Sequence, residues 1–251
     1  MSHIHLPDGV IPTFWWVLGY IVSLVLAFIL LKRVNAQAVR NRIPEMAMMA
    51  AVMLITMSVP LGFIPFHMNF AALAGILLGP GPGFVVVFVA NFILALLGHG
   101  GITAVGLNTL IIGLEALVGG TAFNLLKARL GSIPSSVVST AMALLLSTAL
   151  MILFLSLIGV VNIQSGEGIL HGEHLHEGGA HEGGADQLEL EESHQDDREY
   201  GFGKVTLAGW SAVLAVLLIG IVLECLVTAL IVNFFMKVRP DIINPTSGEK
   251  R

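Results

Sequence analysis

Charged residues are scarce in this chain: of its 251 residues only 12% are charged, while 55% are hydrophobic. A soluble domain carries about 25% charged residues because its surface faces water, so this composition excludes an ordinary soluble protein. The mean hydropathy is +0.87, and the few charges are segregated, which leaves several long apolar runs. Runs of about 18 or more apolar residues can cross a bilayer as helices. The sequence therefore predicts an all-α integral membrane protein.

Other features are missing as well. The single cysteine, Cys225, lies in an apolar segment and cannot form an intrachain disulfide. No Lys or Arg precedes Lys32, so the N-terminus lacks the basic start of a cleaved signal peptide, and we expect it to remain in the mature protein. No basic patch suggests nucleic acid. The glycine-rich stretch 79–83 is not followed by Lys and Ser or Thr, so it is not a phosphate loop. Any ATP-driven step therefore needs another subunit.

Hydropathy predicts about seven membrane spans. Two of them form a pair of shorter apolar stretches joined by Gly79-Pro80-Gly81-Pro82-Gly83, where Pro and Gly should end helices and form a turn. A ten-residue helix rises only about 15 Å, half of the hydrocarbon thickness. The pair is therefore either longer than its apparent boundaries or a re-entrant hairpin. The predicted spans are 13–33, 44–62, 70–79, 84–97, 103–126, 133–161 and 205–236.

The basic residues predict the orientation, because Lys and Arg concentrate in cytoplasmic loops. Ten of the twelve follow span one, separate spans five and six, or lie in the C-terminal tail, and only Arg198 and Lys204 fall elsewhere. An extracytoplasmic N-terminus and a cytoplasmic C-terminus place all ten inside. On this map all nine histidines lie outside, which indicates that the outer face is the functional one.

The hydrophilic stretch 162–203 separates a helical bundle of residues 1–161 from a last span and cytoplasmic tail, residues 204–251. It holds eleven Asp or Glu residues and Gly-rich repeats, and this composition predicts disorder. The stretch could gather divalent metal ions weakly or serve only as a solvated linker. Its five histidines are His171, His174, His176, His181 and His194.

A free amino terminus beside an early histidine is a specific trap for a metal ion. The terminal amine, deprotonated backbone amides and an imidazole can surround an ion in a tetragonal plane, the geometry that suits Ni²⁺ or Cu²⁺. Met1, Ser2 and His3 offer this chelate in full. If the initiator Met is removed, Ser2 and His3 still supply the amine, one amide and the imidazole. A fourth ligand would then come from His5 or His67.

Other polar residues in apolar surroundings are further candidates. His67, just before an apolar helix, could bind metal or only a backbone carbonyl, and His99 lies in a glycine-flanked loop. Asn108 and Glu115 fall inside a predicted span, where polar groups are costly and therefore candidates for function. Two further carboxylates, Glu45 and Glu224, would lie near the cytoplasmic ends of their spans or inside the bundle and make helix-packing hydrogen bonds.

The second span carries a methionine stripe at helical spacing. We expect these thioethers to be adaptable packing rather than a conduit for soft ions. Ala47 and Ala51 on the same span form a pair of small residues suited to close helix contact, within the chain or with a partner. The stripe consists of Met46, Met49, Met53 and Met57.

Several of these motifs in series resemble one family. The opening His5-Leu6-Pro7-Asp8-Gly9 resembles the His-Ile-Pro-Asp-Gly start of the metal-binding membrane components of energy-coupling-factor nickel and cobalt transporters. The residues from His67 to Pro80, from Gly98 to Thr103 and at Asn108-Thr109 are similar to that family in order and spacing. The resemblance is close over roughly residues 3–130 and general over the later spans.

The resemblance implies a seven-helix protein of a prokaryotic inner membrane that binds Ni²⁺ or Co²⁺ on its outer side. Such a protein is no enzyme, and the ion is its substrate rather than a cofactor. It works with a transmembrane coupling protein, with cytoplasmic ATPases, and in some cases with a small accessory membrane protein.

Family members surround the metal with the N-terminal amine, the adjacent histidine and the histidine that corresponds to His67. This chain departs from the usual Met-His start. If the chain is aligned with the family by motif, His5 is the ligand. If it is aligned by distance from the terminal amine, His3 is the ligand. We favour His3 in the chelate with His5 close by. The sequence does not separate nickel from cobalt, because both accept nitrogen ligands.

Two other classes of function compete with this one. A self-sufficient secondary metal transporter would need an ionisable relay through the membrane, and Glu45, Glu115 and Glu224 are scattered along the chain. An intramembrane metalloenzyme would need a His-Glu-x-x-His helix or a nucleophile at membrane depth, and the sequence shows neither. Neither alternative matches the histidines on one side as well.

Overall fold

The computed structural model describes residues 13–34, 36–58, 67–98, 101–158 and 210–240, and within these ranges every regular element is a helix. The elements, in chain order, are α1 (Thr13–Lys32), α2 (Ala36–Asn41), α3 (Ile43–Ser58), α4 (Ala71–Leu78), α5 (Pro80–Leu96), the 3₁₀ turn η1 (Ile102–Ala104), α6 (Val105–Leu130), α7 (Ser132–Ile158) and α8 (Trp210–Val238).

Helix length confirms a helical membrane protein. In the described part of the chain, four apolar helical stretches are long enough to cross a bilayer: Thr13–Lys32, Ile102–Leu130, Ser132–Phe154 and Leu217–Val238. Two shorter apolar helices, Ile43–Ser58 and Pro80–Leu96, accompany them. The count of seven spans and the orientation of the termini stay predictions.

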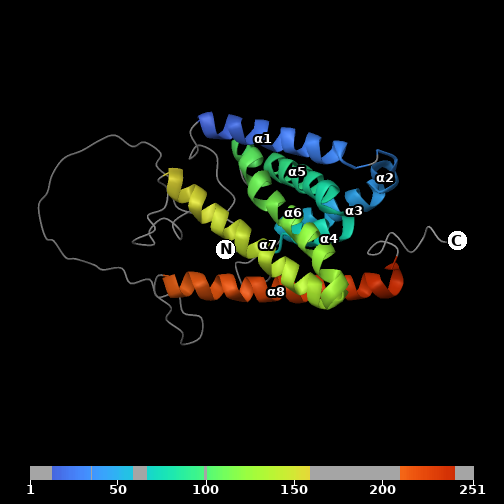
Figure 1. Cartoon of the computed structure of the whole chain (residues 1–251). Helices are drawn as coiled ribbons and strands as arrows, with labels where there is room; N and C mark the ends of the chain where they lie inside the picture. The colour runs from blue at the N-terminus through green and yellow to red at the C-terminus, as the bar shows by residue number, and fades with distance from the viewer. Residues whose placement is uncertain (1–12, 35, 59–66, 99–100, 159–209, 241–251) are drawn as a thin grey trace, which may run out of the picture.

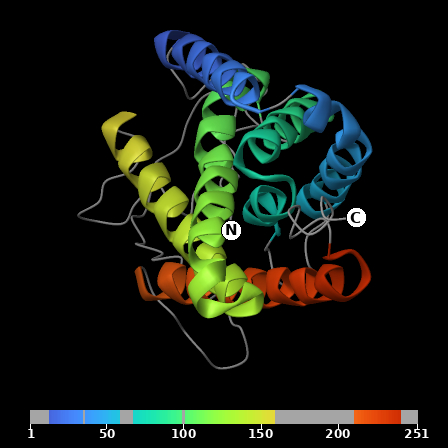
Figure 2. The ribbon, with the colours of Figure 1, turned by 45° about the vertical axis from the view of Figure 1, so that its right-hand side comes forward.

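Helix α6 forms the centre of the bundle. It packs against α1, α4, α5 and α7, and Figure 2 shows it between α7 on one side and α4 and α5 on the other. Most of α6 is buried, whereas most of α1 is exposed. The exposed side chains of α1 are large and apolar, among them Phe14, Ile21 and Phe28, which fits a helix surrounded by lipid.

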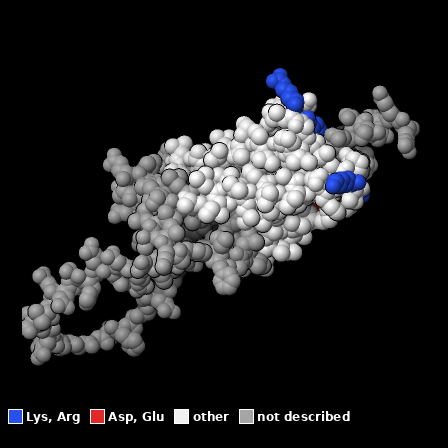
Figure 3. Space-filling view, turned by 90° about the horizontal axis from the view of Figure 1, so that it is seen from below, with Lys and Arg blue, Asp and Glu red and all other residues white. Residues whose placement is uncertain are grey.

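Basic residues gather at one end of the bundle. The last turns of α1, α6 and α8 contain Lys32, Lys127, Arg129 and Lys237, and these three helices end on the same side in Figure 1. Figure 3 shows Lys and Arg at that end, while nearly all of the remaining described surface on this face is uncharged. A cation also interacts favourably with the C-terminal end of a helix. This charge asymmetry supports the predicted orientation.

The expected turn over residues 79–83 is wrong in its extent. The chain turns at Gly79 alone, with φ of 90°, and α5 begins at Pro80. Proline suits the first helical position because the amide hydrogen that it lacks has no partner there. The amide of Gly83 already donates to the carbonyl of Gly79 at 2.9 Å. Helix α5 is therefore longer than predicted, while α4, with eight residues, is only about 12 Å long.

Helix α4 lies directly on the backbone of α6. A Cβ atom at Gly75 would lie 1.9 Å from the carbonyl oxygen of Ala116, and one at Gly120 would lie 2.4 Å from the carbonyl oxygen of Gly75. Only glycine, which has no side chain, permits the two backbones to come so close. The short helix α4 is therefore packed directly against the central helix α6.

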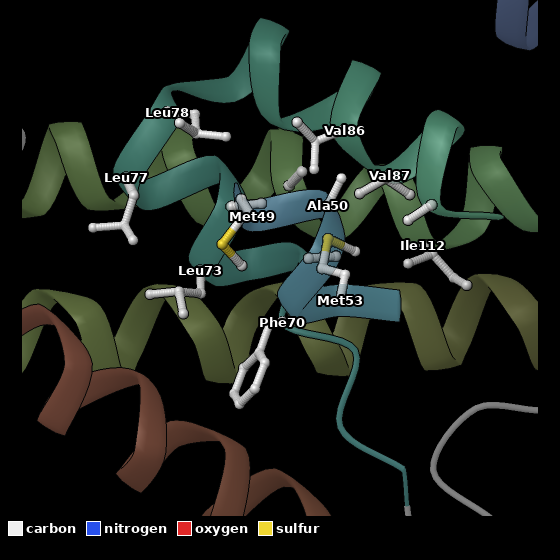
Figure 4. Packing of buried hydrophobic residues seen from close by; sticks show 14 of the residues in the cluster. Met49, Ala50, Met53, Phe70, Leu73, Leu77, Leu78, Val86, Val87 and Ile112 are labelled. Atoms are coloured by element: carbon white, nitrogen blue, oxygen red, sulfur yellow. The ribbon is translucent and has the colours of Figure 1, made fainter. Parts of the chain in front are cut away.

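The methionine stripe packs as expected. Met49, Met53 and Met57 are buried in a core cluster that joins α3 to α4, α5 and α6, with Met46 partly buried against it. Figure 4 shows Met49 and Met53 on the side of α3 that faces α4 and α5. Ala47 and Ala51, by contrast, are exposed, so this small-residue pair makes no close helix contact within the described part of the chain.

Replacing Gly75 with Ala tests the α4–α6 contact. The added methyl group must push α4 off α6, so we expect a loss of at least the roughly 1–3 kcal/mol typical of overpacked cores. The loss should appear as a lower Tm of the protein in detergent. The control Ala51→Leu adds more volume on an exposed face and should leave the Tm unchanged. Equal Tm values for Gly75→Ala and the parent would contradict the contact.

Candidate functional site at the start of helix α4

Residues 67–70 carry polar groups into the bundle. They are not helical, yet Asn69 is 0% and Phe70 4% exposed, and His67 is half-buried. The sequence places His67 in a loop between two spans. Because α4 has only eight residues, the end of this loop reaches into the bundle instead of staying at its surface.

Three side chains from three parts of the chain form a buried polar network. The Nδ2 of Asn69 donates to Oε2 of Glu115 on α6 at 2.7 Å. The Oγ of Ser147 on α7 donates to Oε1 of the same carboxylate at 2.5 Å. Both carboxylate oxygens therefore accept a hydrogen bond, which compensates for the burial of a polar group that is 1% exposed.

Asn69 also organises the start of α4. Its Oδ1 accepts a hydrogen bond from the backbone amide of Ala71 at 2.8 Å, a local bond that Asn makes readily two residues on. The residue between them, Phe70, has φ of 55°, in the left-handed region. A bulky residue there is strained by about 1–3 kcal/mol and persists where its surroundings hold it. The two bonds of Asn69 supply such a hold.

A second polar contact lies between α5 and α6. The Nδ2 of Asn91 donates to Oγ1 of Thr109 at 3.4 Å, and both residues are buried. Asn108 on α6, which was predicted together with Glu115 to lie inside a span, is also buried. Polar side chains thus line α6 on more than one level of the bundle.

The remaining predicted carboxylates lie apart from this network. Glu224 is 1% exposed within α8, so of its two expected positions it takes the one inside the bundle. Glu45 is half-buried in the first turn of α3. The hydrogen bonds of the network join Asn69, Glu115 and Ser147, and neither Glu45 nor Glu224 is part of them.

The predicted ligand set is only partly within the described residues. His67 is described, whereas Met1, Ser2, His3, His5 and His99 lie outside. Within the described ranges, no three His, Cys, Asp or Glu side chains come together in a group that could hold a metal ion. The N-terminal chelate therefore stays a prediction.

Sequence reasoning gave no role to Asn69, Asn91 or Ser147. Each was detectable in one respect, since each is a polar residue within or beside an apolar run, and such residues are costly in a membrane. The sequence contains many other polar residues in similar positions. Nothing in the sequence indicates that Asn69 and Ser147, rather than the others, contact Glu115.

A short internal helix, an irregular segment at its start and buried polar side chains around both are typical of membrane transport proteins. Residues 5–242 match the family described as the cobalt uptake substrate-specific transmembrane region, and the chain belongs to this family. This membership confirms the resemblance found in the sequence. The family is one of transport, consistent with the expectation that the chain is not an enzyme.

Two solved structures share the fold. One, a truncated transition metal transporter, is 21% identical with a TM-score of 0.63, and the match covers 93% of this chain and 99% of that one. The other, a transition metal transporter, is 19% identical with a TM-score of 0.61, and the match covers 94% and 93%. No curated protein sequence is similar enough to be recognised as a relative.

A triple variant with Leu at Met49, Met53 and Met57 tests whether the thioethers only pack. Met and Leu have similar volumes, so each exchange should cost less than about 1.5 kcal/mol, and cobalt uptake should persist in cells that produce the variant together with the partner proteins that the parent needs. The comparison variant Met53→Ala leaves a cavity and should lose about 2–5 kcal/mol of stability. A stable triple variant without uptake would restore the conduit hypothesis.

Proposed function

We propose that this protein captures Ni²⁺ or Co²⁺ on the extracytoplasmic side and carries it across the membrane as the substrate-binding component of an ATP-driven energy-coupling-factor transporter. The observation that supports this best is the position of residues 67–70. They carry His67, the one described histidine, into the bundle, and Asn69, two residues further on, donates a hydrogen bond to Glu115 at 2.7 Å. A transported ion needs such a site within the protein rather than on its surface.

The proposed ligands are nitrogen atoms. In the form without the initiator Met, the terminal amine of Ser2, the amide that follows it and the imidazole of His3 form the chelate, and His67 completes the plane from inside the bundle. His5 lies close by as an alternative to His3, and His99 is a further candidate at the same end. Ni²⁺ and Co²⁺ both accept such donors, and the geometry selects between them.

The proposed partners follow from what the chain lacks. It has no nucleotide-binding motif, so cytoplasmic ATPases would supply the energy and a transmembrane coupling protein would transmit it. The proposed setting is a prokaryotic inner membrane, crossed seven times with the N-terminus outside. The basic ends of α1, α6 and α8 would then face the cytoplasm and the ATPases.

A secondary transporter remains the alternative, and the structure gives it little support. A proton relay needs ionisable groups within reach of one another. Glu115 is bonded to Asn69 and Ser147, while Glu45 and Glu224 belong to other helices.

Metal binding by the purified protein tests the proposed ligands. We expect one Ni²⁺ or Co²⁺ to bind per chain in calorimetry, with a visible absorption band for nickel in a square plane. Residues fused ahead of Met1 remove the free amine, and His67→Ala removes the fourth ligand. Each change should weaken binding by at least about 100-fold, which corresponds to about 2.8 kcal/mol.

The matched control is His194→Ala, a histidine of the stretch 162–203. It should leave the tight site unchanged and alter only weak binding of additional ions. Affinity that survives both the N-terminal fusion and His67→Ala would remove the proposed site.

Metal uptake with and without the partners tests the energy source. We expect cells or proteoliposomes with this chain alone to take up radiolabelled Ni²⁺ or Co²⁺ only at background level. Addition of the coupling protein and ATPases should produce ATP-dependent uptake, and an ATPase variant that cannot hydrolyse ATP should abolish it. Full uptake by the chain alone would favour the secondary transporter.

A further inference from the structure

We infer that Glu115 is a positioning residue for the metal site: through Asn69 it holds residues 67–70 and thereby sets the place of His67. This inference rests on the proposed function, because it assigns a role to a residue that supports one of the proposed ligands. It adds a second group, Ser147, that fixes Glu115 itself.

The first step is the continuity of the contacts. Ser147 on α7 donates to one oxygen of Glu115 at 2.5 Å, and Asn69 donates to the other at 2.7 Å. Asn69 in turn accepts from the amide of Ala71 at 2.8 Å. Side chains of two long helices thus hold Asn69, which lies two residues from His67 in the same non-helical segment.

The second step is what Glu115 contacts. Nδ2 of Asn69 donates to its Oε2 and Oγ of Ser147 to its Oε1, so each oxygen already holds one protein donor. Among the described residues, Glu115 belongs to no group of His, Cys, Asp or Glu side chains that could hold a metal ion. The contacts therefore link the carboxylate to the site through Asn69.

The third step concerns what each residue type must supply. Asn69 is a donor toward Glu115 and an acceptor from Ala71 at the same time, which an amide can do and a carboxylate cannot. Phe70 keeps a φ of 55° between these two bonds. Without the bond to Glu115, one of the interactions that stabilise the strained conformation of this segment is lost. The segment would then relax, and His67 would move with it.

The fourth step is that packing alone does not require a carboxylate here. Replacing a buried polar or ionic pair as a whole by apolar residues of similar volume often causes no loss of stability. Outer groups that orient a metal ligand do have measurable effects, typically about 10- to 100-fold in metal affinity. The network is built from rigid helices, which is the support that a precise site needs.

The experiment measures Ni²⁺ and Co²⁺ affinity and the absorption band of the bound ion in the purified full chain. We expect Glu115→Leu to weaken binding by about 10- to 100-fold and to change the band, because His67 is no longer held in place. Glu115→Gln should bind within about 3-fold of the parent. Its carbonyl still accepts from Asn69, and its amide can donate to Ser147, whose Oγ lies 3.3 Å from the carbonyl of Leu144.

A polarity exchange makes the test independent of Glu115→Leu. Asn69→Asp places two carboxylates face to face and should weaken binding as strongly as Glu115→Leu. Adding Glu115→Gln to Asn69→Asp restores one donor and one acceptor in exchanged positions, so the double variant should recover most of the affinity and the parent band. Non-additivity of this kind is the mark of a direct pair.

The matched control is Glu224→Leu, which removes another carboxylate that is 1% exposed and belongs to α8. It should leave both affinity and band unchanged. The inference is overturned if folded Glu115→Leu binds like the parent, if Glu224→Leu weakens binding equally, or if the double variant shows no recovery. A parent protein that binds no metal would instead overturn the proposed function, so the two failures are distinguishable.

Discussion

The direct contact between the backbones of α4 and α6 is the constraint on which the remaining arrangement depends. It exists because Gly75 and Gly120 have no side chains, and a Cβ at Gly75 would lie 1.9 Å from a carbonyl oxygen of α6. An eight-residue helix that is too short to cross a bilayer is thereby held inside the bundle. The chain must then turn at Gly79 and leave as α5, and residues 67–70 must lie among the helices.

Irregular backbone at membrane depth is tolerated only where protein surrounds it or water lines it, because its polar groups have no partners in lipid. The segment 67–70 meets this condition through Asn69, which bonds to the amide of Ala71 and to Glu115. The same two bonds that make the segment tolerable also fix its conformation. Burying a carboxylate usually costs stability, but here the carboxylate of Glu115 holds a non-helical segment in place through its hydrogen bond with Asn69.

The sequence predicted the helical membrane class and most helix positions, because long apolar runs carry their own signal. It also identified Glu115 as a polar group inside the bundle and predicted that Met53 packs in the core. It misjudged residues 79–83, since Pro80 and Pro82 can begin a helix as readily as they end one. The partners of Glu115 could not be predicted, because Asn69 and Ser147 meet it only through the crossing of α4, α6 and α7, which hydropathy does not encode.

In the proposed site the ligands differ in how much support they need. Once the initiator Met is removed, the terminal chelate still holds three donors in a plane through its own covalent rings, so the fold determines little of their arrangement. The fourth donor, His67, has no such link to the others, and its position depends on the protein alone. A network that spans α6 and α7 and ends two residues from His67 is therefore placed where fixed geometry matters most. Glu115 and Asn69 would accordingly contribute to the geometry that distinguishes one transition metal from another, although only the nitrogen atoms touch the ion.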